Sequence, residues 1–283
     1  MLGLGNSITG GTALSDFIVS DLSEVVTWLR AEDNVTTDSN GVARWRDKVG
    51  TADWVSNEST RQPALVGSGT AARLRFDGAD RMYQKDYDWD SSTDGSAFAP
   101  AHDRFDTMNA GGSGGFHIFI VWEVSQQHGQ IAHTILAENH FVSLSPLVTR
   151  DDIKGIIKAF TKGDFISVEG IVGSAVAFNN TTSAGTEFPL ATANETALDG
   201  TSKFLLTIEY AGGTNGEITM RVNGVNKALT NNTTATLGEV TVGELGGLSM
   251  RADLYELINC SSKLSSGNRD LVENYLMTRH SIS

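Results

Sequence analysis

The segment Phe116–Val124, FHIFIVWEV, is almost continuously apolar and is rich in β-branched and aromatic residues. A run of this length and composition favours a β-strand whose two faces are both buried and whose two edges are both paired. We therefore expect this segment to lie at the centre of a sheet, with the other strands of the chain arranged around it.

Several other segments carry strand signals and are separated by turn-forming residues. Asn223-Gly224 stands between the alternating run Glu217–Val222 and Val225, and this dipeptide between two such runs is the strongest short-range signal of a β-hairpin. The run Arg73–Phe76 alternates charged and apolar residues, which predicts a strand with one face in water. Further short strands are expected at Val25–Leu29, in two Trp-containing segments of Val42–Val55, at Arg61–Val66 and at Lys203–Tyr210.

The middle and the end of the chain differ in their periodicity. Thr134–Phe178 consists of short apolar runs broken by glycines, which is typical of an antiparallel meander, and the patch Asn179–Leu190 after it has the composition of a linker. Near the end, Ser266–Arg279 predicts a short helix on the edge of the sheets, because its apolar residues recur at helical intervals. These residues are Leu271, Val272, Tyr275 and Leu276.

Composition and charge narrow the class of protein. Thr, Ser, Asn and Gly are abundant while Lys and Arg are few, a balance that favours many short strands joined by turns and hence an all-β fold. The formal net charge of −13 opposes binding to a phosphate backbone, so no nucleic-acid partner is expected. No apolar run approaches the roughly 18 residues that cross a bilayer, so no membrane partner is expected. The single cysteine, Cys260, has apolar neighbours and is expected to be a buried, unreactive thiol.

Segments from the two ends of the chain resemble the opening and the closing motifs of concanavalin A-like, laminin G-like jelly rolls. The segments that carry the resemblance are Val26–Asp33, Trp45–Asp47, Leu74–Asp80 and Gly246–Ile258. The resemblance implies an all-β jelly-roll β-sandwich with an N-terminal extended arm and a short C-terminal helix. We expect residues 1–20 to form the arm and residues 21–283 to form a single jelly-roll domain.

No constellation of catalytic residues is found in the sequence. Jelly rolls of this class include glycan-cleaving enzymes, and their retaining members need two carboxylates about 5 Å apart on one strand face, in the pattern E-x-D-x-E. The nearest approach is Asp253 with Glu256, whose spacing of three residues predicts opposite faces of a strand. Spacings for a catalytic zinc site, a nucleophile elbow or a phosphate-binding loop do not occur, and His117 reads as a satisfied core histidine. We expect a protein that is not an enzyme and has no catalytic residues.

Two acidic segments of the sequence are candidate metal sites. The turn Asp77–Asp80 is expected to use its carboxylates to cap its own backbone, because Arg81 beside it opposes calcium. A second segment alternates carboxylates and aromatics like the start of a calcium-binding loop, but Ser91 and Ala97 stand where that loop needs Gly and Glu. A solvated loop is favoured there, with a bound calcium ion as the alternative, and no other cofactor is expected. Its ligands would be Asp86, Asp88, Asp90 and Asp94.

The same acidic segment offers two aromatic side chains, Tyr87 and Trp89, that could stack on a sugar ring while the nearby acids orient it. The alternative is that Trp89 packs beneath its own loop. These residues, together with the jelly-roll fold that the resemblance implies, suggest a carbohydrate-binding or adhesion role with a host-surface glycan as partner.

The first residues of the chain, followed directly by this jelly roll, look like virion-associated proteins of tailed bacteriophages. This resemblance implies a non-enzymatic capsid decoration or other accessory protein, with capsid or tail subunits as partners, and a homo-oligomer as its state. The chain lacks the pattern of a secretory signal, so we expect it to be made in the host cytoplasm and located in the virion. The carbohydrate-binding module, in a tail or fibre, is the alternative. The residues expected to make the assembly contact of the arm are Leu2, Leu4, Asn6, Ile8 and Phe17.

Overall fold

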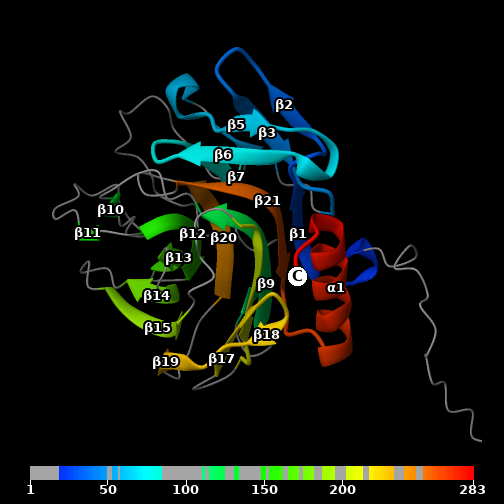
Figure 1. Cartoon of the computed structure of the whole chain (residues 1–283), viewed down its shortest axis with the longest axis vertical. Coiled ribbons are helices and arrows are strands. Elements are labelled where there is room, and N and C mark those ends of the chain that lie inside the picture. Colours follow the sequence, from blue (N-terminus) through cyan, green and yellow to red (C-terminus); the bar gives the residue numbers. More distant parts are fainter. Residues whose placement is uncertain are drawn as a thin grey trace, which may run out of the picture.

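The strand predicted to be central, β9 (Phe116–Val124), lies in the middle of a sheet in the computed structural model (Figure 1). It pairs antiparallel with β16 (Phe204–Tyr210) on one side and with β21 (Arg251–Cys260) on the other. The structure describes residues 19–49, 53–56, 58–84, 110–111, 115–124, 131–133, 148–150, 153–161, 165–171, 175–181, 187–194, 202–212, 217–232, 239–246 and 251–283.

This first sheet has eight strands in the described part of the chain. Outward from β16 it continues through β17 and β18, and outward from β21 through β6 and β5, while β1 pairs with the second half of β21. The strand bounds are β1 Val25–Arg30, β5 Ala64–Val66, β6 Arg73–Asp77, β17 Ile218–Val222 and β18 Val225–Asn226. The β17–β18 hairpin is confirmed, and Asn223 and Gly224 at its turn both have positive φ angles, of 50° and 73°.

The second sheet has the order β19-β15-β14-β13-β12-β20-β7-β4-β3-β2, with β8 also paired to β20. Its bounds are β2 Val35–Thr37, β3 Val42–Arg46, β4 Asp53–Val55, β7 Arg81–Gln84, β8 Ala110–Gly111, β12 Ile153–Thr161, β13 Phe165–Ile171, β14 Ala175–Thr181, β15 Glu187–Asn194, β19 Leu229–Asn232 and β20 Glu239–Gly246. A separate pair joins β10 (Ile131–His133) to β11 (Val148–Arg150). Single 3-10 turns occur at Val19–Asp21, Ser59–Arg61 and Gly69–Ala71.

The meander predicted for Thr134–Phe178 is confirmed from residue 153 onward, because β12, β13 and β14 pair consecutively and antiparallel, and β15 continues the pattern beyond it. The linker predicted at Asn179–Leu190 is wrong, since Asn179 and Asn180 pair with both neighbouring strands and β15 begins at Glu187. Polar residues with low strand propensity are held here by the ladders on both sides, which override the local preference.

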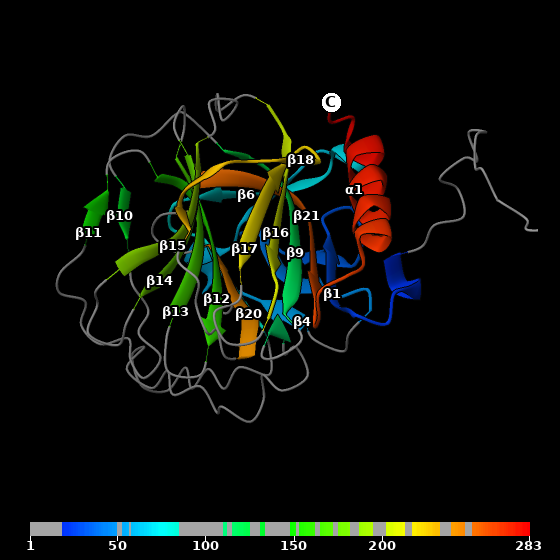
Figure 2. The same cartoon turned by 90° about the horizontal axis from the view of Figure 1, so that it is seen from below.

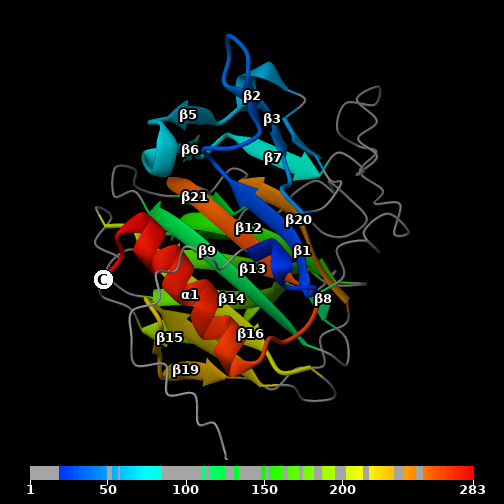
Figure 3. The same cartoon turned by 90° about the vertical axis from the view of Figure 1, so that its right-hand side faces the viewer.

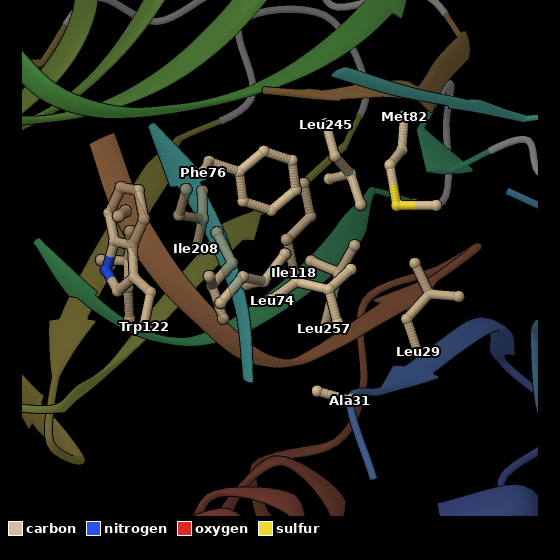
Figure 4. Close-up of a cluster of buried hydrophobic side chains, with 14 of the residues drawn as sticks. Leu29, Ala31, Leu74, Phe76, Met82, Ile118, Trp122, Ile208, Leu245 and Leu257 are labelled. Carbon is tan, nitrogen blue, oxygen red and sulfur yellow. The ribbon is translucent and has the colours of Figure 1, made fainter. Parts of the chain in front are cut away.

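The main core lies between the two sheets, which confirms the all-β sandwich. Along β6 the side chains alternate, and Leu74 and Phe76 point inward and are buried. Figure 4 shows how these residues and others of the first sheet meet Met82 and Leu245, which come from β7 and β20 of the second sheet.

A second apolar cluster lies on the outer face of the first sheet, and the C-terminal helix α1 (Ser266–His280) covers it (Figures 2 and 3). Val272 and Leu276 of the helix pack in this cluster with Phe119, Leu205 and Ile258 of the sheet. The helix was predicted and is confirmed, but its predicted position on the edge of the sandwich is wrong. The central strands are apolar on both faces, and the outer face therefore needs a cover.

Cys260 belongs to this outer cluster and is fully buried. Burial raises the pKa of its thiol, so the sulfur stays protonated, as the sequence predicted for an unreactive cysteine. Within the described residues, no helix has the length and apolar character that crossing a bilayer requires.

Candidate functional site

The site residues predicted from the sequence fall outside the described residues, and those predictions stay predictions. This holds for the calcium ligands and glycan contacts of the acidic loop and for the assembly contact of the arm. The residues are Asp86, Tyr87, Asp88, Trp89, Asp90 and Asp94 of the loop, and Leu2, Leu4, Asn6, Ile8 and Phe17 of the arm. A candidate site must therefore be built from the rest of the chain.

A row of charged residues crosses the outer face of the first sheet. Glu123 of β9 pairs in register with Asp253 of β21, and Asp253 pairs in register with Arg75 of β6. Lys203 directly precedes β16. The first residue of β16, Phe204, pairs with Trp122 of β9, so Lys203 stands next to Glu123 across the two strands. Side chains in register share a face, and the adjacent residues Leu74, Trp122 and Leu254 belong to the core between the sheets. The charged residues therefore point away from the core.

We call the set Arg73, Arg75, Glu123, Lys203, Asp253 and Tyr255 the charged face. The helix α1 does not cover all of it: Figure 3 shows α1 crossing the outer face with β6 beyond the helix. The ring of Tyr255 contacts that of His280 at the end of α1, edge to face, at a centroid distance of 5.8 Å. The side chain of Arg75 is 50% exposed, whereas that of Asp253 is 8% exposed.

Asp253 holds the two arginines of the charged face in place. Its carboxylate accepts hydrogen bonds from Arg73 Nε at 2.6 Å and from Arg75 Nε and Nη2, both at 2.8 Å. Two guanidinium groups share one nearly buried carboxylate, so the group carries a net positive charge and its side chains are fixed in orientation.

Tyr255 lies at the centre of the charged face. Its hydroxyl donates to Glu123 Oε2 at 3.1 Å, while Lys203 Nζ lies 4.7 Å and Arg73 Cζ 5.9 Å from the ring centroid. Burial raises the pKa of Tyr255, so the phenol remains a donor. Burial also lowers the pKa of Lys203, which makes no ion pair with a residue that the structure describes.

The prediction that Asp253 and Glu256 point to opposite faces is wrong. The pairing of β21 with β9 shifts between Leu254 and Glu256, and this bulge turns Glu256 to the same outer face as Asp253. The two carboxylates nevertheless serve separate partners, since Asp253 binds Arg73 and Arg75 while Glu256 binds the residues around Trp28. They do not converge as the two acids of a retaining glycosidase must.

Glu256 is fully buried between the sheet and α1 and accepts several hydrogen bonds. Trp28 Nε1 donates to it at 2.6 Å and Tyr275 Oη at 3.3 Å, and His280 Nε2 lies 2.8 Å from its second oxygen. Arg279 Nε forms an ion pair with that oxygen at 3.3 Å. Burial, followed by the charge of Glu256, raises the pKa of Tyr275 to about 12, so this phenol stays a donor. The enclosure of Glu256 indicates a structural role.

His117 is the satisfied core histidine that the sequence predicted. It is fully buried, its Nδ1 accepts from the backbone N–H of Leu264 at 2.9 Å, and its Nε2 lies 3.0 Å from Glu209 Oε2. This hydrogen bond lowers the pKa of Glu209 to about 2. Among the residues that are described, no three His, Cys, Asp or Glu side chains are placed to share a metal ion.

The turn Asp77–Asp80 caps its own backbone, as predicted. Asp80 Oδ2 accepts from the backbone N–H of Asp77 and Asp77 Oδ1 accepts from that of Ala79, each at 2.9 Å. Burial of Asp80 raises its pKa to about 7 despite the Asp77 N–H bond, and the charge of Asp77 adds to the increase. The carboxyl of Asp80 is therefore easier to bury when it is protonated.

Asp80→Asn is expected to make the protein more stable than the wild type at pH 8, with little difference at pH 4. An unfolded aspartate titrates near 4, so between pH 4 and about 7 the folded protein holds a proton that the unfolded chain has lost. Wild-type stability should therefore decline across this window relative to the variant, whose amide oxygen still accepts from Asp77. Urea unfolding of both proteins at pH 4 and pH 8 measures the difference, and an equal gap at the two pH values would contradict the expectation.

Sequence reasoning missed the charged face, although part of its signal was present. The alternation along Arg73–Phe76 predicted a wet strand face with two arginines on it. Glu123, Lys203 and Asp253 come from three other strands or strand ends, and they meet the arginines only through the strand order β16-β9-β21-β6. That order is not readable from local periodicity.

No family model matches the chain, and no curated protein matches its sequence. Among solved structures, the chain is similar to the binding domain of botulinum neurotoxin serotype D/C, with a TM-score of 0.52, 10% identity, and coverage of 92% of this chain and 53% of that one. The receptor binding domain of botulinum neurotoxin D gives a TM-score of 0.51 at 9% identity, covering 90% and 53%. The botulinum neurotoxin serotype D ligand binding domain in complex with N-acetylneuraminic acid gives 0.50 at 9% identity, covering 89% and 51%.

This chain therefore spans about half the length of these toxin domains. At such low identity the likeness establishes the fold alone, which is a β-sandwich. None of the three is a virion protein, and the virion location, the virion partners and the homo-oligomer stay predictions from the sequence.

Proposed function

We propose that this chain is a carbohydrate-binding module and that the charged face is a contact area for its ligand. The observation that carries the proposal is a set of polar groups that point outward from the first sheet, on a part of its outer face that α1 leaves partly uncovered. Asp253 fixes Arg73 and Arg75, and Tyr255 fixes Glu123. Few, precisely oriented polar groups on a rigid support are what sugar recognition needs, because they can meet hydroxyl groups without rearranging.

Two further facts support this function over catalysis. On the outer face, Asp253 and Glu256 are each bound by cationic side chains, and Glu123 accepts a hydrogen bond from Tyr255, so these carboxylates already serve structural partners. One domain of similar fold, from botulinum neurotoxin serotype D, was crystallised with N-acetylneuraminic acid. A binding role needs only the geometry of the charged face and no reacting group.

The test is binding of the full chain to a glycan array, with Arg75→Ala as the main variant. We expect the wild type to bind a subset of glycans and Arg75→Ala to lose at least about tenfold in affinity, since a charge-assisted hydrogen bond is removed. Arg61→Ala is the matched control, because Arg61 is 35% exposed and pairs only locally with Glu58 at 2.7 Å. Binding that Arg61→Ala and Arg75→Ala weaken equally would contradict the role of the charged face, and absence of any glycan binding would contradict the function.

Trp89→Ala belongs in the same experiment, because the acidic loop is the other contact area predicted for a sugar. If Trp89→Ala abolishes binding while Arg75→Ala does not, the ligand binds at the loop and the charged face is structural. If both variants weaken binding, the two areas contact the same ligand.

A further inference from the structure

The charged face is positive although the chain is strongly negative. Its members are three cations, Arg73, Arg75 and Lys203, and two carboxylates, Glu123 and Asp253, within a protein of net charge −13. Long-range repulsion by the rest of the protein is screened beyond roughly 10 Å at ordinary salt concentrations. The local excess of cations therefore decides which ligands this face favours.

The cations keep hydrogen-bond donors that their present partners do not use. Arg73 gives Nε to Asp253 and Nη1 to the carbonyl of Ala71, and Arg75 gives Nε and Nη2 to Asp253. Arg73 Nη2 and Arg75 Nη1 thus make no hydrogen bond within the described part of the chain. Unused N–H groups of two guanidiniums that share one carboxylate partner can donate charge-assisted hydrogen bonds to the carboxylate of a ligand.

Lys203 is the group that gains most from a bound anion. Its ammonium lies above the ring of Tyr255, partly removed from water, without an ion pair to any residue the structure describes. Partial burial of a cation is unfavourable, and an anionic ligand beside Lys203 would add to the partial compensation that the charge of Glu123 gives. Glu123 accepts from Tyr255 through Oε2, and its Oε1 accepts no hydrogen bond from the part of the chain that the structure describes, so it can accept one from a hydroxyl group.

We propose that the charged face selects sugars that carry a carboxylate, which the unused N–H groups of Arg73 and Arg75 bind. Lys203 adds a second positive charge above the Tyr255 ring, and Glu123 accepts from a hydroxyl of the same ligand. This inference rests on the proposed function and specifies its ligand class. A neutral sugar could make only the weaker, uncharged hydrogen bonds with the same groups.

The experiment is calorimetric titration of the full chain, at low ionic strength, with matched pairs of small sugars. Methyl glucuronide and methyl glucoside differ only in the carboxylate, and the methyl glycoside of N-acetylneuraminic acid is a second acidic probe. We expect the acidic member to bind at least about tenfold more tightly than the neutral one, and this preference to shrink as salt is added.

Lys203→Gln is the sharpest variant, because it removes a charge without dismantling the pairing of Asp253 with its arginines. It should reduce affinity for the acidic sugars by about tenfold and affinity for neutral sugars by much less, because a neutral sugar has no carboxylate that loses a charged partner. Arg75→Gln should act in the same direction, Arg61→Gln should have no effect, and an unchanged melting temperature verifies that each variant is folded.

Equal affinity for glucuronide and glucoside, or full acidic-sugar affinity in both Lys203→Gln and Arg75→Gln, would overturn the inference. Binding of polyglutamate as tightly as an acidic sugar would also overturn it, because the face would then recognise charge alone. If the glycan array shows neutral glycans only, the inference fails and the carbohydrate-binding function stands. If no glycan binds at all, the function itself fails.

Discussion

Glu256→Gln is expected to lower the free energy of unfolding by about 3–5 kcal/mol, because removing one partner of a buried ion pair leaves the others uncompensated. Glu256 is fully buried and faces the indole of Trp28, the phenol of Tyr275, the imidazole of His280 and the guanidinium of Arg279. The amide of glutamine has one acceptor and two donors, so it cannot receive all of these groups, and it supplies no negative charge for Arg279.

The effect should spread to both ends of the described chain, since the ion pairs of this region are linked. Arg279 also pairs with Glu32, and Glu32 pairs with Arg30 at 3.2 Å. Arg30 in turn bonds to Asp33, which holds Lys48 at 2.8 Å. Lys48 and Arg30 both lie over the ring of Trp28, at 5.0 and 5.4 Å from its centroid. Loss of Glu256 therefore loosens α1 and the segment that follows β1 together.

Urea unfolding followed by tryptophan fluorescence measures this loss. Glu58→Gln is the matched control: Glu58 also pairs with an arginine, but the pair is at the surface, with side chains 35% and 38% exposed. An exposed pair of this kind contributes about 0–1 kcal/mol. Equal losses in the two variants would show that the Glu256 network contributes no more than an ordinary surface ion pair.

The resemblance between the two ends of the chain and jelly-roll motifs was a good guide to the fold, and the reason is physical. β1 from the front end pairs with β21 from the back end, and the rings of Trp28 and Tyr275 meet edge to face, with their centroids 6.3 Å apart and an interplanar angle of 81°. These ends carry the residues that close the first sheet and hold α1 on it. Because β1 and β21 must pair and the Trp28 and Tyr275 rings must pack together, only certain residues are compatible with the fold at each end of the chain, and this makes the motifs recognisable in the sequence.

Local patterns predicted the elements whose causes are local. Asn223-Gly224 sets its turn through positive φ angles, and Ser265 caps α1 by accepting from the N–H of Asn268 at 3.1 Å. The position of α1 depends instead on which strands are neighbours, because Phe119, Leu205 and Ile258 form one apolar surface only after β9, β16 and β21 are paired.

The candidate site depends on the same long-range information, and on one irregularity. The charged face unites β6, β9 and β21 with Lys203, and no single strand signals it: β6 alternates charged and apolar residues, while β9 is almost continuously apolar. The bulge after Leu254 turns Glu256 to the outer face, and no feature of Asp253–Glu256 in the sequence signals it. A spacing rule that assumes a regular strand therefore fails there.

Gly115→Ala is expected to lower the free energy of unfolding by more than about 3 kcal/mol, for two reasons that act together. Gly115 has a φ angle of 70°, which disfavours any residue with a Cβ atom, and it directly precedes the central strand β9. A Cβ at this position would lie only 2.1 Å from the carbonyl oxygen of Tyr210 and 2.9 Å from the carbonyl carbon of Ala211. Both are backbone atoms, and Tyr210 pairs with Phe116, so relief of the clash must separate the ends of β9 and β16.

Gly69→Ala isolates the conformational part of this cost. Gly69 has a comparable φ angle of 56°, but a Cβ there would meet nothing within 4 Å. Gly69→Ala should therefore lower the free energy of unfolding by only about 1–2 kcal/mol, which is the cost of placing a residue with a Cβ atom in the left-handed region. Urea unfolding and thermal melting of the two variants beside the wild type give both values. If both variants lose the same free energy of unfolding, the backbone around Gly115 and Tyr210 can move apart at little cost, and close backbone packing does not hold this end of β9.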